Sequence, residues 1–296
     1  MATVRTKIRF TPLDAAVIAA LAVAGVFLAH RIKTSLGYDW NWSAIAGYLV
    51  RFDQESNSYV AGLITQGLLT TLRLSVFATI LATILGTIMG LLAVGKGLFS
   101  RLIVRAYVET IRNLPPLVLV FLFYFFFSDR LMALIGLDQA VRSAPEWVQG
   151  ILSVLFAKPS LFTAFFSALL TLAVYEGAYI TEIVRAGIQS VEKDQWEAAN
   201  ALGLNRFQRM RHVIMPQAVR RILPPLTGQL ISTVKDSAIV SVISIQELTF
   251  QGMEAMAATY RTFEIWTTVL VLYLIVCLGL SLASRRLEVW LERRGG

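Results

Sequence analysis

Several ionisable residues lie inside the long apolar stretches of this sequence, namely Arg73, Glu109, Arg112, Glu176, Glu182, Arg185, Lys235 and Asp236. A charged group in an apolar setting is costly, so such a group usually faces a cavity, a ligand or an opposite charge. The cationic members can hold a carboxylate, and the acidic members can hold an ammonium group or a basic side chain. These residues are therefore the first candidates for a binding site.

Spacing separates these candidates into two kinds. Glu109 and Arg112 are three residues apart, as are Glu182 and Arg185, so each couple can form an ion pair within one helix. Glu176 has no such partner in its own helix. The positions three and four residues away from it hold Leu172, Ala173, Tyr179 and Ile180. Glu176 must therefore face water, a ligand or a basic group from another helix.

We expect a polar cavity near the bilayer midplane, bordered by Arg112 and Glu176. Tyr175 and Tyr179 flank Glu176 and either line this pocket or serve only in packing.

One glycine-rich stretch resembles a nucleotide-binding loop but departs from its pattern. GLLAVGKG, residues 90–97, has Gly-Lys in place, but Gly97 stands where the pattern needs the Ser or Thr whose hydroxyl binds magnesium. The chain is therefore expected to hold no ATPase machinery. Its single cysteine, Cys277, excludes an intrachain disulfide, and we expect no metal site.

The composition indicates a helical integral membrane protein. Hydrophobic residues make up 56% of the 296 and charged residues 16%, against about a quarter charged in soluble proteins. The mean hydropathy is +0.64. Apolar runs long enough to cross a bilayer predict six membrane spans, at roughly 12–30, 60–94, 104–127, 161–186, 217–243 and 263–284. Gly86 and Gly90 in the second span have a spacing that permits close helix packing.

The distribution of basic residues predicts that both termini are cytoplasmic. With six spans in that orientation, 15 Lys and Arg residues fall on the cytoplasmic side and 7 on the other, as expected for cytoplasmic loops. The same bias accounts for the formal net charge of +8 without a nucleic-acid partner. The first span shows no clear cleavage site before His30, so we expect an uncleaved helix; if it is a signal peptide, five spans remain.

A basic stretch interrupts the apolar chain at about residues 190–216. QWEAANALG contains good helix formers, and Gly203 suits the end of a helix. A second short helix over FQRMRHVIM is expected to stop at Pro216. Two short helices joined by a glycine bend make a rigid protruding knob, although spacing alone leaves open an ordinary amphipathic loop.

This stretch resembles the EAA loop of bacterial ABC importer permeases. The motif is Glu197-Ala198-Ala199, Gly203 and Val213-Ile214-Met215-Pro216. Further segments are similar to permeases of the polar amino acid uptake family, namely TTLRLSVFATILATILG, YVETIRNLPPLVLVFLFYF, GAYITEIVRAGIQSV and PPLTGQLISTVKDSAIVSVISIQEL. The resemblance covers about residues 60–285. It implies an all-α membrane protein with a five-helix core at 59–285, one extra N-terminal helix within 1–58, and a cytoplasmic tail at 286–296.

The resemblance also implies partner proteins and a cellular location. In this family the EAA loop docks on a separate ATPase, which binds ATP and magnesium. Two ATPases, two identical or homologous permeases and a periplasmic amino acid-binding protein form a transporter in the bacterial inner membrane. Glu197 is then expected to pair with a basic residue of the ATPase, and Gly203 to permit the bend. The basic rim consists of Arg206, Arg209 and Arg211, each of which is alternatively a contact for lipid phosphate.

For an amino acid substrate, the resemblance gives the ionisable residues in the spans specific roles. The groups expected to hold the carboxylate are Arg73, Arg112 or Lys235. The groups expected to hold the ammonium or a basic side chain are Glu109, Glu176 or Asp236. Whether the permease has its own site or leaves selection to the binding protein stays open. An ion-coupled secondary amino acid transporter is the alternative function, and the EAA loop argues against it.

Overall fold

The computed structural model describes residues 11–36, 38–54 and 57–295, which divide into two units, Met1–Ala44 and Ile45–Gly296. The first unit contains one long helix, α1 (Pro12–Leu36). Its apolar part, Pro12–Phe27, rises about 24 Å, which is shorter than the ~30 Å hydrocarbon core of a bilayer. The predicted helix is therefore present, and its role as a membrane span stays a prediction.

The second unit opens with a short helix and a β-hairpin. Helix α2 (Ser43–Leu49) leads into β1 (Val50–Asp53), which pairs antiparallel with β2 (Ser58–Ala61). In the register Val50 lies opposite Ala61 and Asp53 opposite Ser58. The hairpin delivers the chain to the first long helix of this unit.

Long helices form the body of the second unit. Four helical stretches are long and apolar enough to cross a membrane, namely α3 (Leu63–Val94), the run Pro116–Ile135, the run Pro159–Gln189 and the part of α14 (Thr262–Gly295) that ends at Trp290. A fifth long helix, α12 (Met215–Asp236), runs beside α9 (Phe162–Gln189). It is less apolar because it carries Arg220, Arg221, Lys235 and Asp236. These five helical passages match the predicted five-helix core.

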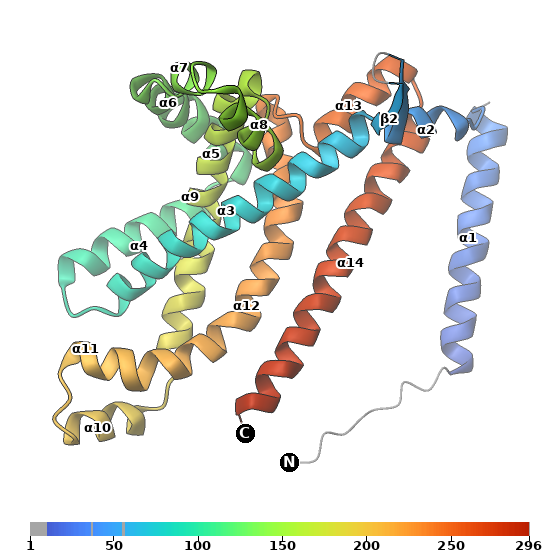
Figure 1. Cartoon of the computed structure of the whole chain (residues 1–296). Coiled ribbons are helices and arrows are strands. Elements are labelled where there is room, and N and C mark those ends of the chain that lie inside the picture. The colour runs from blue at the N-terminus through green and yellow to red at the C-terminus, as the bar shows by residue number, and fades with distance from the viewer. Residues whose placement is uncertain (1–10, 37, 55–56, 296) are drawn as a thin grey trace. The chain divides into compact units, whose positions relative to one another are not determined.

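Short helices gather at the two ends of this unit (Figure 1). The hairpin end holds α6 (Asp129–Ile135), α7 (Leu137–Arg142), α8 (Glu146–Leu155) and α13 (Leu248–Thr259). The opposite end, called the loop end here, holds α10 (Lys193–Ala201) and α11 (Arg206–Arg209). The C-terminal end of α14 also lies at the loop end. The chain therefore places its C-terminal segment on the same side as the EAA segment, defined as residues 190–216.

The predicted third span, 104–127, is wrong as a single helix. The chain forms α4 (Leu98–Asn113), breaks, and resumes as α5 (Pro116–Leu122), which continues through a π-helical turn over Phe123–Ser128 into α6. The break follows from Pro115 and Pro116, because a residue before proline is pushed out of the α region. Leu114 accordingly has φ −93° and ψ 147°.

The predicted fifth span, 217–243, is helical throughout but changes type. Helix α12 ends at Asp236, and a 3₁₀ helix, η4 (Ser237–Ile243), continues it to the hairpin end.

Two glycines allow α3 and α9 to pack closely, as their spacing predicted. A Cβ on Gly86 would stand 2.7 Å from Cβ of Ile180, and one on Gly90 would stand 2.6 Å from Cγ1 of Val184. Side chains cannot tolerate such contacts, so small residues are required wherever backbones approach this closely. This contact fixes α9 against α3 and thereby positions both ends of α9.

Candidate functional site

The first half of the EAA segment folds as the sequence predicted. Helix α10 is followed by Gly203 in the left-handed region at φ +72°, and its N–H donates to the carbonyl of Asn200 at 2.9 Å. Such a left-handed residue closes a helix at little cost when it is glycine. Ala199 of the Glu-Ala-Ala triplet is buried, whereas Glu197 and Ala198 are exposed. The motif thus presents one face inward and one outward.

The second half corrects the prediction that a short helix stops at Pro216. Helix α11 is closed at its start by a capping box, in which Asn205 and Gln208 exchange bonds of 2.9 and 3.0 Å. A π-helical turn, η3 (Met210–Ile214), then joins α11 to α12. Proline is tolerated in the first turn of a helix because its missing N–H needs no partner there. Pro216 occupies that place in α12, so the helix continues through it.

The EAA segment is tied to the long helices by side-chain contacts. The guanidinium of Arg221 in α12 donates to the carbonyl of Ser190, and Gln217 donates to Oε1 of Gln195 at 3.1 Å. The guanidinium of Arg209 lies over the ring of Trp196, 5.6 Å from its centroid, a cation–π contact. The apolar face packs into a core with both α9 and α12. A displacement of α10 is therefore passed directly to these two helices.

The outer surface of the segment combines one acid with exposed apolar groups. Leu202 is 78% exposed and Phe207 is 70% exposed, and both lie close in sequence to the exposed Glu197. Large apolar side chains gathered on a protruding surface are typical of a protein-docking site. Arg206 is also exposed, so it lies on this rim, whereas Arg209 is half buried against Trp196 and contributes less to it.

A basic cavity of ≈ 540 Å³ lies between the EAA segment and the end of α3. Lys96, Arg206 and Arg209 line it together with Trp196 and Phe207. The positive charge of this cavity favours an anion. It therefore supports the alternative that these arginines bind lipid phosphate.

One predicted ion pair is wrong and the other is confirmed. Glu109 pairs with Arg105 at 2.6 Å instead of Arg112. The alternative arises because positions four apart are also neighbours on a helix. Arg112 lies over the ring of Tyr179 in α9, 5.4 Å from its centroid. Arg185 and Glu182 form the expected pair at 2.6 Å.

Glu176 is fully buried and meets no basic side chain in the part of the chain that the structure describes. Gln229 of α12 donates to its Oε2, while Oε1 has no hydrogen-bond partner among the described residues. Asp236 is a second acid close to this carboxyl group. The tyrosines that flank Glu176 contact each other, with 3.3 Å between the hydroxyl groups of Tyr175 and Tyr179.

A cleft of ≈ 520 Å³ runs along α9 and α12 and contains part of the expected polar site. Arg112, Tyr179, Glu182, Arg221 and Gln229 are among its lining residues. The cleft thus collects two cations, an acid, a phenol and an amide.

Several predicted site residues lie outside this cleft. Glu176 does not line it and is connected to it only through Gln229. Tyr175 is buried, Lys235 is exposed, Asp236 is half buried and Glu109 is exposed beside Arg105. Arg73 lies in the N-terminal half of α3 and lines a different cavity, at the hairpin end.

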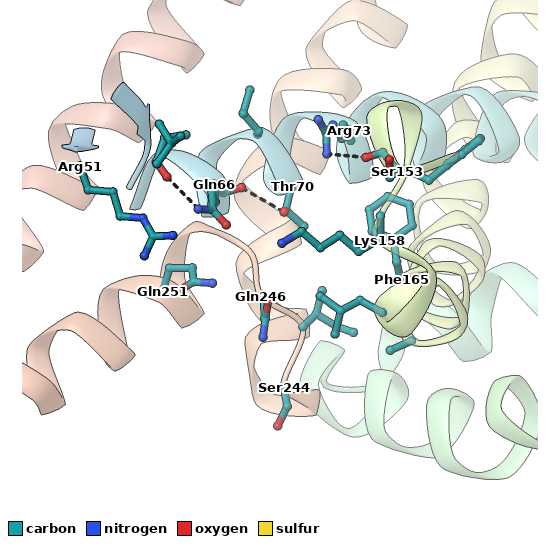
Figure 2. Close-up of a pocket in the computed structure, with 18 of the residues that line it drawn as sticks. Arg51, Gln66, Thr70, Arg73, Ser153, Lys158, Phe165, Ser244, Gln246 and Gln251 are labelled. Carbon is teal, nitrogen blue, oxygen red and sulfur yellow. Dashed lines mark hydrogen bonds between the residues drawn. The ribbon is translucent and has the colours of Figure 1, made fainter. Parts of the chain in front are cut away.

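The hairpin pocket, a cavity of ≈ 430 Å³, was not predicted (Figure 2). Its wall combines three cations, Arg51, Arg73 and Lys158, with Asp53 and several amide side chains. Only Arg73 had been named from the sequence, because the charge pattern assigned Arg51 and Lys158 to external loops. No periodic signal links these segments, since the pocket is assembled from the hairpin, α3, the residues before α9, and the η4–α13 connection.

Glu247 is a second buried acid that the sequence did not single out. It caps α13, accepting from the N–H groups of Thr249 at 2.9 Å and Phe250 at 2.7 Å. The hydroxyl of Tyr273 in α14 donates to it at 2.9 Å, and that of Thr71 in α3 at 3.3 Å. Burial raises the pKa of the Glu247 carboxyl, and these hydrogen bonds oppose that shift. The residue therefore joins three helices at the floor of the hairpin end.

In the described residues, no group of three or more His, Cys, Asp and Glu side chains is placed to hold a metal ion.

Comparison with known proteins adds a family to this geometry. Residues 82–294 match the family described as "binding-protein-dependent transport system inner membrane component". The chain belongs to this family. The permease is thus a membrane-embedded transport component, as distinct from the ATPase of an ABC importer. The predicted resemblance and all-α membrane fold are confirmed.

Individual relatives agree with this assignment. The permease is 43% identical to the glutamine transport system permease protein of Escherichia coli (strain K12) over 155 residues, which are 51% of this chain and 70% of that one. It is 30% identical over 241 residues to a putative glutamine transport system permease protein of Rickettsia bellii, covering 81% and 96% of the two chains.

Solved structures show the same fold. A crystal structure of an amino acid ABC transporter with histidines gives a TM-score of 0.64 at 30% identity, covering 85% of the permease and 99% of that chain. An inward-facing MetNI methionine ABC transporter gives a TM-score of 0.58 at 19% identity, covering 77% and 96%, and supports the fold alone.

Proposed function

We propose that the permease imports polar or charged amino acids and is driven by ATP hydrolysis in a separate subunit. The names of its relatives, which refer to glutamine and amino acid transport, support this substrate class. In the proposed complex, two ATPase subunits bind ATP and magnesium. This permease acts with an identical or homologous second permease, and a periplasmic binding protein delivers the solute in the inner membrane.

The single observation that carries the proposal is the architecture of the EAA segment. Its outer surface presents Glu197 beside exposed apolar groups, and its inner surface is fastened to α9 and α12 through Ser190, Arg221 and the buried core. A partner that binds the outer surface and moves will therefore move both helices. This is the connection that an importer with a separate motor requires.

The position of the cleft suits transport driven in this way. Most of its lining comes from α9 and α12, the two helices that the EAA segment holds. Gln229 of α12 and Tyr179 of α9 line it, and Arg112 reaches it from the end of α4. A relative shift of the two helices would change the width of this cleft. We place the solute path here, with Arg112 available to a carboxylate.

The loop end is placed in the cytoplasm in this proposal. The charge distribution supports that orientation, because the EAA segment and the C-terminal end of α14 share one end of the unit and both are rich in basic residues. The N-terminus is placed on the same side, which requires α1 to cross the membrane.

Reversing the charge of Glu197 tests the proposal. The variant Glu197→Lys should lose co-purification with the ATPase and lose ATP-driven uptake in proteoliposomes by at least about tenfold, because a contact charge would be turned against its partner. Glu146→Lys is the matched control, since Glu146 is an exposed acid in the first turn of α8 at the hairpin end. Wild-type uptake by the Glu197 variant would refute the docking role. Uptake that follows an ion gradient without ATP would favour a secondary transporter.

A further inference from the structure

We propose that the hairpin pocket is a second solute site, at the hairpin end of the permease, and that it selects an amino acid with an acidic side chain. This inference rests on the proposed function, because it narrows the substrate class within amino acid import. It concerns a cavity separate from the cleft between α9 and α12.

The pocket has the size and construction of a small-molecule site. Its ≈ 430 Å³ lies within the ~300–1,000 Å³ usual for ligand pockets. In Figure 2 the side chains of Arg51, Gln251 and Lys158 extend toward a common space from the hairpin, from α13 and from the segment before α9. Apolar walls come from Phe156, Leu161 and Phe165.

The charge of the pocket wall is unbalanced toward cations. Arg51, Arg73 and Lys158 line it against one acid, Asp53. None of these three cations has an ion-pair partner among the described residues. Arg73 makes one long contact of 3.5 Å from Nη1 to the carbonyl of Ser153, which leaves most of its five N–H donors for a ligand. The lining therefore has an excess of positive charge, which favours an anionic ligand.

An amide on the pocket wall adds a polar contact for a ligand. Gln251 is 5% exposed as a residue and lines the pocket, and no hydrogen bond ties its side-chain amide to another side chain in the described part of the chain. Its amide group therefore faces the space of the pocket. Gln66, by contrast, donates to the carbonyl of Ala61 at 2.7 Å and is held in place. A polar ligand inside the pocket would satisfy Gln251.

An acidic amino acid matches these groups better than a neutral one. Its two carboxylates can meet the cationic groups of Arg73 and Lys158 or Arg51 by charge-assisted hydrogen bonds, and its ammonium group can meet an amide oxygen. Arg51 and Lys158 are exposed and Arg73 is half-buried, so water can reach these cations when no ligand is bound. A neutral amino acid has a single carboxylate, so it makes fewer charge-assisted hydrogen bonds to them than an acidic one does.

The test measures solute binding to the purified complex of permease and ATPase, in nanodiscs, without nucleotide and without the binding protein. Isothermal titration with L-glutamate, L-glutamine and L-arginine should give at least about tenfold tighter binding of L-glutamate than of L-glutamine, and the weakest binding of L-arginine. Lys158→Gln should remove most of the preference for L-glutamate over L-glutamine. Gln251→Leu should weaken both ligands.

A control variant is provided by Arg142→Gln. Arg142 is an exposed cation at the same end, paired with Asp138 at 2.8 Å, and it does not line the pocket. Its ligand affinities should equal those of the wild type, and the melting temperatures of the Arg142 and Lys158 variants should agree. Equal affinity for L-glutamate and L-glutamine in the wild type, or an unchanged preference in Lys158→Gln, would overturn the proposal.

Failure of this inference is distinguishable from failure of the proposed function. Binding without nucleotide does not require coupling, whereas the Glu197 experiment reads ATPase attachment and ATP-driven uptake. If Lys158→Gln lowered only the stimulation of ATP hydrolysis by the binding protein and left solute binding intact, the pocket would be a docking contact instead of a solute site. That result would also overturn the proposal.

Discussion

The EAA segment and the hairpin pocket are both rich in charged groups, but they are encoded in opposite ways. The EAA segment is a continuous run of chain, and the left-handed bend at Gly203 is closed by a hydrogen bond to Asn200, three residues away. The hairpin pocket brings together Arg51, Arg73 and Lys158, which come from three separate segments of the chain. The EAA segment is formed by local contacts, and we propose that it binds the ATPase; the hairpin pocket exists only once the helices have packed.

This difference predicts how each region fails. The EAA segment should lose its function through single substitutions at positions that need a particular backbone conformation or charge. The membrane domain should stay folded in such variants. An assembled pocket fails through any residue that fixes the packing of its contributing helices, including residues that never touch the ligand.

The largest effect is expected from Gly203→Pro in the EAA segment. Gly203 has φ +72°, which proline cannot adopt, and its N–H donates to Asn200, which proline would abolish. A backbone penalty of about 3 kcal/mol corresponds to about a hundredfold, so ATP-driven uptake in proteoliposomes should fall by about that factor. Gly203→Asn is the control, because asparagine tolerates the left-handed region, and it should transport almost normally. Equal uptake by both variants would show that the bend is dispensable.

An intermediate effect is expected from Glu247→Ala beside the hairpin pocket. The change leaves the N–H groups of Thr249 and Phe250 without their acceptor, and it releases α13 from α3 and α14. Leaving buried donors unsatisfied costs about 1–3 kcal/mol, so the melting temperature should drop. L-glutamate affinity should also drop, since α13 carries Gln251.

Glu254→Ala provides the comparison for Glu247. Glu254 is an exposed acid on the same helix, and its removal should change neither quantity. A Glu247 variant with lowered stability but unchanged L-glutamate affinity would show that ligand binding in the hairpin pocket does not depend on how α13 packs. The pocket would then differ less from the EAA segment in the way it fails.

The same contrast explains what the sequence could reveal. Local rules predicted the α10 helix, the left-handed Gly203 and the close approach at Gly86 and Gly90, because each depends on a few neighbouring residues or a fixed spacing. Pro115 and Pro116 are an equally local signal, because proline restricts the backbone of the residue before it. They predict a break within the span at 104–127.

Long-range contacts were beyond these rules. The sequence offered Glu109 two arginines at helical spacing, and only packing against Tyr179 decided that Arg112 turns toward α9. Nothing local distinguishes Lys158 from an ordinary loop lysine, or marks Glu247 as the cap that joins three helices. The sequence shows which side chains are present, but the tertiary fold determines which residues surround each of them.

The smallest effect is expected from Glu176→Gln, which lies between the two regions. The structure places Gln229 and Asp236 around this carboxyl group and leaves Oε1 without a partner in the described residues. The introduced amide would keep an acceptor for Gln229 and would remove a buried carboxyl group from beside a second acid, Asp236. The free energy of unfolding should therefore change by no more than about 1 kcal/mol, and it should not fall.

Amino acid preference should also be unchanged in this variant, because Glu176 does not line the cleft. The measurement is stimulation of ATP hydrolysis by a panel of amino acids in the reconstituted transporter, together with the melting temperature. Gln229→Leu is the comparison, since Gln229 lines the cleft and also bonds Glu176; it should alter both quantities. A changed preference in Glu176→Gln alone would mean that the solute reaches Glu176 past Gln229. The solute site would then extend beyond the cleft to the buried face of α9.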